Sequence, residues 1–154
     1  MESFISKWAV DLSVAEHTCL RRGCKRDRHG MACFYMLTKV HKNPHTFRPV
    51  VATCGTVLLI LSSWLDYKLK QLLPFVEACT RNSSDLRSKM NNLGKLPRNA
   101  RLVTADATST HTGVNAEHGL STLRGFLEEL ESNGSLPQDF NIEMATEAAA
   151  LVMH

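Results

Sequence analysis

The stretch "CFYMLTKVHKNPHTFRPVVAT" (residues 33–53) contains two β-like runs joined by a polar segment. The runs "CFYMLTKV" and "FRPVVAT" are rich in the β-branched and aromatic residues that favour strands. The segment "HKNPHT" separates them, and its Asn-Pro pair is a turn signal. The sequence therefore predicts a β-hairpin with a short basic tip.

Cationic side chains flank the predicted tip at Lys39, Lys42 and Arg48, together with His41. Arginine can hold a phosphate group through two parallel hydrogen bonds, whereas lysine acts as a point charge. Such a ribbon suits a nucleoside triphosphate or a nucleic-acid backbone. The alternative is an ordinary solvated hairpin whose charges only provide solubility.

Helices are predicted on both sides of the hairpin, which makes the expected fold class α+β. Apolar residues recur at intervals of three or four, which is the period of a helix. The predicted helices cover residues 4–20, the segment from the cap Thr56 to about Pro74, the segment from Ser83 or Ser84 to about Asn92, the segment from the cap Asn115 to about residue 132, and residues 140–152. The basic stretch "RRGCKRDRHG" (residues 21–30) has two glycines and no such period, so we expect a loop there.

The charge of the chain is divided unevenly along its length. The whole chain has 154 residues and a net charge of +3, but residues 1–101 carry 17 Lys and Arg against 7 Asp and Glu. Residues 102–154 carry 1 Arg against 8 acids. This asymmetry indicates a polyanion partner for the first part. The alternative is one domain with oppositely charged solvated faces.

Five cysteines without paired spacing argue against a disulfide framework and for a reducing compartment. Glu2, Asp11 and Glu16 interrupt any signal-peptide pattern near the start. The longest apolar run, residues 57–61, is too short to span a bilayer. We therefore expect an intracellular protein, nuclear or cytoplasmic, without a membrane segment.

A single acid ends the apolar run in "ARLVTADATSTHTGVN" (residues 100–115). We expect a strand over residues 101–106, with Asp106 at its end. An acid there can hold Mg²⁺, which prefers one or two carboxylates and completes its shell with phosphate and water oxygens. It can also accept a phosphoryl group, although that class of site usually has a further acid two residues on, where this chain has Thr108. Alternatively, Asp106 only caps the following turn.

Taken together, these stretches resemble a reverse transcriptase of the Penelope-like or related non-LTR type. "FYMLTKVHKNPHTFRPVVATCGT" is similar to the fingers pattern FYxLPKIHK, a variable turn, RPIVS and a CGS-like end. "NNLGKLPRNARLVTADATSTHTGVNAEHGL" is similar to the palm pattern LP-x-N-x-x-LVTxDVTSLYTNIPxxEGL. The resemblance covers residues 33–154.

The resemblance implies an incomplete right-hand polymerase fold, with the fingers hairpin, its helices, and the first strand and helices of the palm. Residues 33–98 correspond to the fingers and residues 99–154 to part of the palm. Residues 1–32, a helix and a basic loop, match nothing in the family. The implied partners are an RNA template, a DNA primer and a deoxynucleoside triphosphate, and the implied cofactor is Mg²⁺.

The resemblance also implies roles for five residues. Asp106 matches the first catalytic aspartate, which binds the magnesium ions with help from the next backbone carbonyl, here that of Ala107. Lys39 and Arg48 match fingers positions that contact the incoming triphosphate. His111 matches the aromatic residue beneath the sugar. Because imidazole is smaller and more polar than the usual Tyr, we expect weaker exclusion of ribonucleotides.

The family is an RNA-directed DNA polymerase, a nucleotidyltransferase typical of retrotransposons, and it needs two further palm aspartates. The chain reaches His154 without them. Two magnesium ions need several shared oxygen ligands, so one carboxylate is insufficient. We therefore expect a truncated reverse transcriptase domain that is inactive by itself. The alternative is a non-catalytic nucleic-acid-binding module that keeps the basic fingers.

Overall fold

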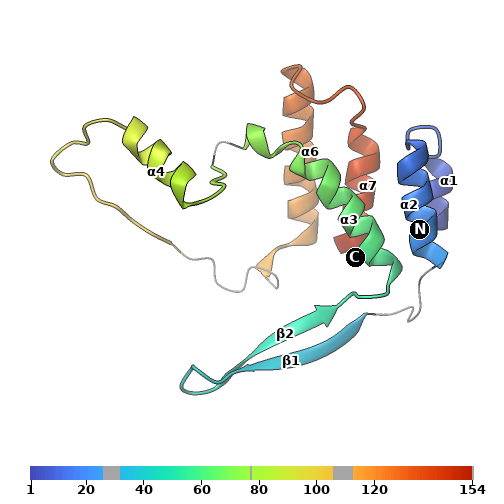
Figure 1. Cartoon of the computed structure of the whole chain (residues 1–154), viewed down its shortest axis with the longest axis horizontal. Coiled ribbons are helices and arrows are strands. Elements are labelled where there is room, and N and C mark those ends of the chain that lie inside the picture. The colour runs from blue at the N-terminus through green and yellow to red at the C-terminus, as the bar shows by residue number, and fades with distance from the viewer. Residues whose placement is uncertain (26–31, 77, 106–112, 154) are drawn as a thin grey trace.

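The computed structural model describes residues 1–25, 32–76, 78–105 and 113–153. This part of the chain contains α-helices and one antiparallel pair of strands, so the α+β class is confirmed (Figure 1). The elements in chain order are α1 (Glu2–Lys7), α2 (Val14–Lys25), β1 (Cys33–Lys39), β2 (Thr46–Ala52), α3 (Val57–Lys70), the 3-10 turn η1 (Leu73–Phe75), α4 (Ser83–Asn92), α6 (Ala116–Ser132) and α7 (Ile142–Met153).

Five helices form the packed part of the molecule, which we call the helical body. In it α3 packs against α2 and α7, α1 packs against α2, and α6 packs against α7. The alanine side chains of α7 are small, so the neighbouring helices can pack close to it. The buried apolar side chains of the body are Phe4, Ile5, Leu12, Leu20, Leu61, Trp64, Leu65, Leu72, Leu127, Leu130, Phe140, Met144, Ala145, Ala148 and Ala149.

The prediction of one helix over residues 4–20 is wrong, because two helices form there. α1 ends at Lys7 and α2 begins after Ser13. A reciprocal cap starts α2: the amide of Glu16 donates to Ser13 Oγ at 3.3 Å, and the amide of Ser13 donates to Glu16 Oε2 at 2.9 Å. α2 then continues to Lys25, so the predicted loop is also wrong for residues 21–25.

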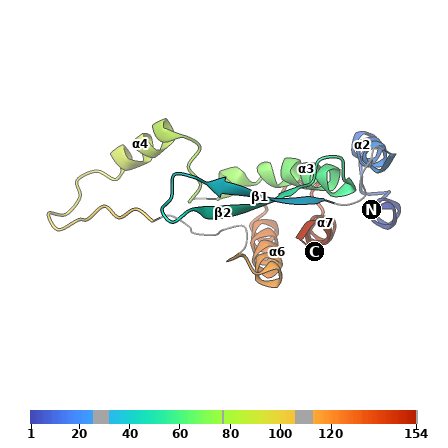
Figure 2. The same ribbon diagram turned by 90° about the horizontal axis from the view of Figure 1, so that it is seen from below.

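The predicted β-hairpin is confirmed. β1 and β2 pair antiparallel with a register that runs from Cys33 opposite Ala52 to Lys39 opposite Thr46. No residue of either strand is buried. Figure 2 shows the hairpin extending away from the helical body, toward the end of the molecule where α4 also lies.

Residues 78–105, which we call the basic arm, also extend away from the helical body (Figure 1). Asn82 caps α4, which has no buried residue. The strand predicted over residues 101–106 is wrong for residues 101–105, which form no strand. Leu102 and Val103 are each 82% exposed, because no neighbouring strand among the described residues covers them.

The predicted starts of the other helices agree closely with the structure. Thr56 precedes α3, although its hydroxyl donates to the carbonyl of Thr53 at 2.7 Å and caps no amide. Asn115 caps α6 by accepting from the amide of His118 at 2.9 Å. The last helix was predicted over residues 140–152 and begins at Ile142, because Asn141 Oδ1 accepts from the amide of Met144 at 2.9 Å. None of the described helices combines the length and hydrophobicity needed to cross a membrane.

Candidate nucleic-acid interface

The hairpin register brings Lys39 and Arg48 to the same face of the ribbon. Arg48 lies opposite Leu37, and Lys39 lies opposite Thr46. Because strand side chains alternate between faces, residues directly opposite each other share a face, as do residues two apart. Lys39 and Arg48 are therefore diagonal neighbours, roughly 7–8 Å apart at their backbones. Both side chains can reach one phosphate chain along this face.

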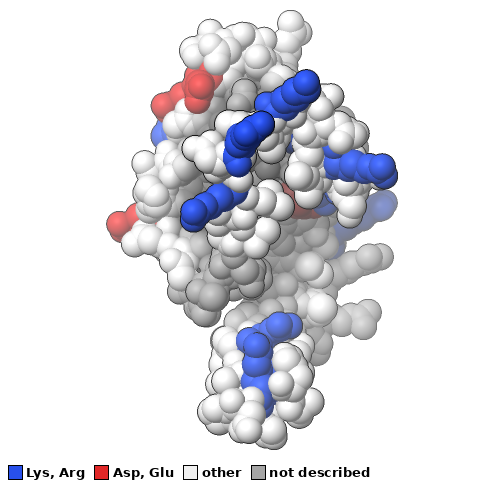
Figure 3. Space-filling model, turned by 90° about the vertical axis from the view of Figure 1, so that its left-hand side faces the viewer, with Lys and Arg blue, Asp and Glu red and all other residues white. Residues whose placement is uncertain are grey.

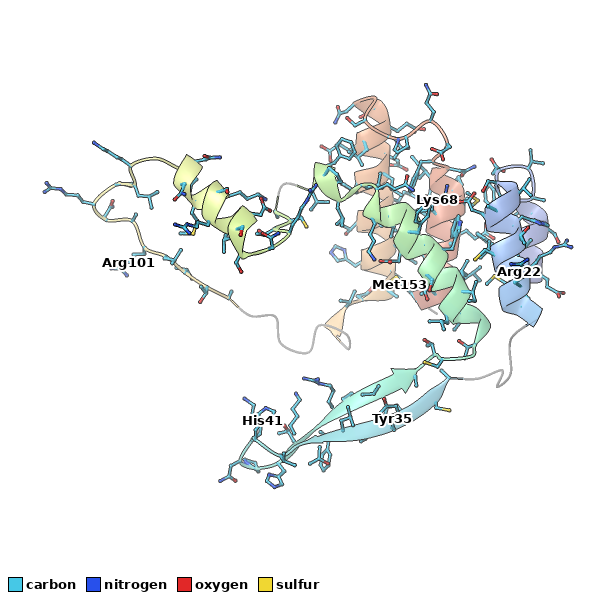
Figure 4. The ribbon with its side chains drawn as sticks, in the orientation of Figure 1. Arg22, Tyr35, His41, Lys68, Arg101 and Met153 are labelled. Carbon is cyan, nitrogen blue, oxygen red and sulfur yellow. The ribbon has the colours of Figure 1, made fainter. Side chains whose placement is uncertain are left out.

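Tyr35 lies on the same face, next to Arg48. It is opposite Val50, two residues from Arg48, and its side chain is 46% exposed. Figure 4 shows Tyr35 on strand β1 and His41 at the tip of the hairpin. We call Tyr35, Lys39 and Arg48 the cationic face of the hairpin. Tyr35 was not among the predicted site residues, although the period of two along residues 35–39 could have identified it.

The tip of the hairpin adds positive charge without any acid. His41, Lys42 and His45 are all exposed, and His45 Nδ1 lies 2.9 Å from the carbonyl oxygen of Lys42. Residues 32–65 contain no Asp or Glu. A phosphate chain that approaches the ribbon therefore meets no repelling side chain from this segment.

The basic arm is the second concentration of positive charge. Residues 78–105 contain six Lys and Arg and a single acid, Asp85. That acid accepts a hydrogen bond from the amide of Arg81 at 3.0 Å, and it lies 4.0 Å from the Lys89 ammonium. Figure 3 shows lysine and arginine on the side of the molecule that carries both the arm and the hairpin. The exposed cations of the arm are Arg81, Arg87, Lys89, Lys95, Arg98 and Arg101.

Negative charge is concentrated in the C-terminal part of the chain. Residues 113–153 carry seven acids and one Arg. A hollow of about 520 Å³ beside the α6–α7 turn is lined by five carboxylates, those of Asp11, Glu128, Glu131, Asp139 and Glu143. Like charges repel, so this end of the helical body disfavours a phosphate chain. The charge distribution therefore favours the hairpin and the arm over this end of the helical body for contact with a polyanion.

Three of the predicted site residues, Asp106, Ala107 and His111, lie outside the described residues. The structure therefore does not test the predicted catalytic and metal-binding roles, and they stay predictions. Of the predicted site residues, Lys39 and Arg48 are the two that the structure brings together. Among the described side chains, no three from His, Cys, Asp and Glu form a group that could hold a metal ion.

The comparisons with known proteins found no match: no family model, no curated protein and no solved structure is significantly similar to this chain. A function is therefore proposed from the sequence motifs and the geometry of the hairpin and the arm.

Proposed function

We propose that this chain comprises the fingers and the first part of the palm of an RNA-directed DNA polymerase related to the Penelope-like reverse transcriptases. The observation that carries the proposal is the hairpin, whose register makes Lys39 and Arg48 diagonal neighbours on one face of a strand pair without buried residues. These are the two positions that the fingers motif assigns to phosphate contacts. The right-hand polymerase fold is part of this proposal.

In this proposal Arg48 and Lys39 hold the triphosphate of an incoming deoxynucleotide. The guanidinium fork of Arg48 matches two phosphate oxygens, and the Lys39 ammonium adds a mobile charge beside it. Asp106 and the carbonyl of Ala107 would hold Mg²⁺, which would supply charge stabilisation for the transferred phosphoryl group. His111 would lie under the sugar of that nucleotide.

We do not expect these 154 residues to polymerise by themselves. They include the counterpart of the first catalytic aspartate, Asp106, and no counterpart of the later aspartate pair. In a primer-extension assay with Mg²⁺ or Mn²⁺, we expect no template-directed product from this chain. Template-directed synthesis that the Asp106→Asn variant abolishes would contradict this expectation.

Nucleotide cross-linking tests the role of the hairpin directly. A photoreactive deoxynucleoside triphosphate should label peptides from residues 33–53. The Arg48→Gln variant should reduce this labelling by at least about tenfold, because a hydrogen bond to a charged group contributes about 1.5–3 kcal/mol. Arg22→Gln, an exposed cation of α2 on the helical body (Figure 4), is the matched control and should label like the wild type. Equal labelling of wild type and Arg48→Gln would count against the proposal.

A second candidate is a nucleic-acid-binding module without catalysis. The segregation of charge favours it, since the hairpin and the basic arm carry nine Lys and Arg against the single acid Asp85. Such a module binds nucleic acid with an affinity that falls steeply with salt, because phosphate contacts release counterions. It shows no saturable nucleotide labelling, and this separates it from the first proposal.

A further inference from the structure

We propose that the face of the hairpin opposite to the cationic face packs against the same face of a second copy of this chain, which makes the protein a weak two-fold dimer. This inference is independent of the proposed function, since the face that carries Lys39 and Arg48 stays open in the dimer. Three observations support it: the apolar composition of the other face, its exposure, and the sizes of its side chains.

The second face of the hairpin is almost entirely apolar. Side chains alternate between the two faces of a strand, so the residues between Tyr35, Lys39 and Arg48 in the pairing pattern share the other face. We call this set the apolar face of the hairpin, and it consists of Phe34, Met36, Thr38, Phe47, Pro49 and Val51. None of these side chains carries a charge. The face therefore offers nothing to a phosphate chain or to a charged protein surface, and its complement is another apolar surface.

The apolar face is open to solvent over its whole length. All six of its residues are exposed, and the rings of Phe34 and Phe47 are 65% and 58% exposed. Because a fully covered aromatic side chain buries about 150–250 Å², this face can bury on the order of 500 Å² in each copy. Two copies then bury on the order of 1,000 Å², which is close to the smallest area of a specific protein interface. We therefore expect a specific but weak dimer.

A second copy fits this face because its side chains complement one another in size. The register puts Phe34 beside Val51 at the end of the hairpin next to α3. It puts Thr38 beside Phe47 at the end next to the tip. A two-fold axis that crosses the strands at Met36 places each ring over a smaller side chain, Phe34 over Thr38 of the second copy and Phe47 over Val51 of the second copy. Large side chains that meet small ones interdigitate well between stacked sheets.

The same axis keeps the two helical bodies apart. The hairpin extends away from the helical body in two perpendicular views (Figures 1 and 2). When the tip of one hairpin lies over the base of the other, the two bodies stand at opposite ends of the paired hairpins. Packing tip over tip would bring both bodies to the same end, where they would compete for space.

The edges of the hairpin offer a different way to associate. Pro49 has no amide hydrogen, which weakens pairing at the edge of β2, but β1 contains no proline and its edge can pair with another strand. Such pairing uses backbone groups and leaves the apolar face uncovered. Side-chain substitutions on the apolar face therefore distinguish packing of the faces from pairing of the edges.

Sedimentation of the whole chain tests the dimer, at protein concentrations of about 1–200 μM and at about 50 and 500 mM salt. We expect a reversible equilibrium between monomer and dimer that does not weaken with salt, because apolar contacts are not screened. Phe34→Thr/Phe47→Thr should weaken dimerisation at least about tenfold, because four rings leave the centre of the interface. Threonine keeps the preference for a strand.

Leu37→Thr is the matched control. Leu37 lies opposite Arg48 on the other face of the hairpin, and its side chain is 50% exposed. The control removes apolar surface from the same strand but not from the apolar face, so it should dimerise like the wild type. All substituted side chains are exposed, and circular dichroism checks that each variant is folded.

A photoreactive benzoylphenylalanine in place of Phe34 tests how the two copies are arranged. Mixing isotope-labelled and unlabelled chains identifies cross-links between copies by their mass. These cross-links should reach residues 36–40 of the second copy. Cross-links between copies that reach residues 49–53 instead would show tip-over-tip packing and would contradict the proposed arrangement.

Three further results would overturn the inference. One is a chain that stays monomeric at the highest concentration. Another is unchanged dimerisation of the double threonine variant, which would assign the contact to the strand edges. The third is self-association that weakens with salt, which would assign it to the basic arm and the acidic hollow beside the α6–α7 turn. Nucleotide labelling of the wild type at residues 33–53 is a separate measurement, so the proposed function and this inference can fail independently.

Discussion

The ammonium of Lys68 lies 2.9 Å from Oε1 of Glu16, and this ion pair joins α3 to α2 inside the helical body. The two side chains are only 8% and 15% exposed. Trp64 Nε1 also donates to Glu16 Oε1, at 2.9 Å. The carboxylate that caps α2 is thus the same one that neutralises a nearly buried lysine.

Removing the charge of Glu16 should destabilise the protein strongly. The Glu16→Gln variant leaves the nearly buried Lys68 ammonium with the more distant Asp139 Oδ2, at 3.9 Å, as its counterion. The cost should be about 3 kcal/mol, the lower end of the range for broken buried pairs. Urea unfolding measures this loss of free energy of unfolding. The matched control is Asp66→Asn, which breaks the exposed pair between Asp66 and Lys70 in the same helix. Such exposed pairs contribute about 0.3–0.5 kcal/mol, so equal effects of the two variants would contradict the prediction.

The same carboxylate should make stability depend on acid pH. Burial alone raises the pKa of Glu16, but hydrogen bonds from the Ser13 hydroxyl, Lys68, the Ser13 amide and Trp64 outweigh it and lower the pKa to about 2. The unfolded chain therefore binds a proton at higher pH than the folded chain. The stabilisation is fully present above pH 4.5 and is lost as the pH falls toward about 2, by an amount on the order of 3 kcal/mol.

Unfolding measured at several pH values between 6 and 2 checks this dependence. The wild type should lose more stability over the acid range than Glu16→Gln, because the variant has no proton to gain at this position. Parallel acid profiles for the two proteins would show that another group is responsible.

The start of α2 shows which of the Glu16 contacts could be predicted from the sequence. The residues "SVAE" (13–16) match the capping-box pattern of Ser followed three residues later by Glu, which marks a helix start. The expected continuous helix over residues 4–20 overlooked it, because the apolar period continues across the break through Trp8 and Leu12. The partners of Glu16 on α3 could not be predicted, since nothing local relates residues 48 and 52 positions apart.

The hairpin shows where prediction from local sequence succeeds, and residues 101–105 show where it fails. The hairpin was predictable because its strands are adjacent in sequence and a turn signal stands between them, and its register then gives the shared face of Lys39 and Arg48. Residues 101–105 have strand-like composition, but a strand also needs a hydrogen-bonded neighbour, and none lies among the described residues. Local composition predicts that a segment tends to form a strand, but the strand forms only where the tertiary structure supplies a neighbouring strand.

Gly23 should not tolerate a larger side chain. A Cβ at this position of α2 would lie 2.6 Å from Ile60 Cγ1 and 2.7 Å from Ile60 Cβ on α3. Ile60 is branched at Cβ and cannot rotate away, so Gly23→Ala should force α2 and α3 apart and cost about 1–3 kcal/mol. Gly125→Ala in α6 is the control, because its Cβ would meet nothing within 4 Å. Alanine there should stabilise the helix by up to about 1 kcal/mol, so the two variants should shift the thermal midpoint in opposite directions.

Removing the asparagine cap of α6 should lower the stability of the whole protein, whereas removing that of α4 should affect α4 alone. Asn115→Ala removes the cap of α6, which packs in the helical body, and should lower the global free energy of unfolding by about 1 kcal/mol. Asn82→Ala removes the cap of α4, which has no buried residue. Fraying of α4 should therefore leave the thermal midpoint unchanged and appear only as faster amide hydrogen exchange in residues 83–92.

The Asn82→Ala variant also separates the order of the basic arm from its charge. All six arm cations remain, and phosphate neutralisation depends on their number, so the salt dependence of nucleic-acid binding should stay unchanged. The affinity for nucleic acid should fall by less than about tenfold, because fraying one cap costs about 1 kcal/mol of ordering on binding. A loss as large as that caused by neutralising Arg87, Lys95 and Arg98 with glutamine would mean that the fold of α4, and not its charge, creates the binding surface. Fluorescence anisotropy with a labelled nucleic acid, measured at several salt concentrations in parallel with hydrogen exchange, distinguishes the two cases.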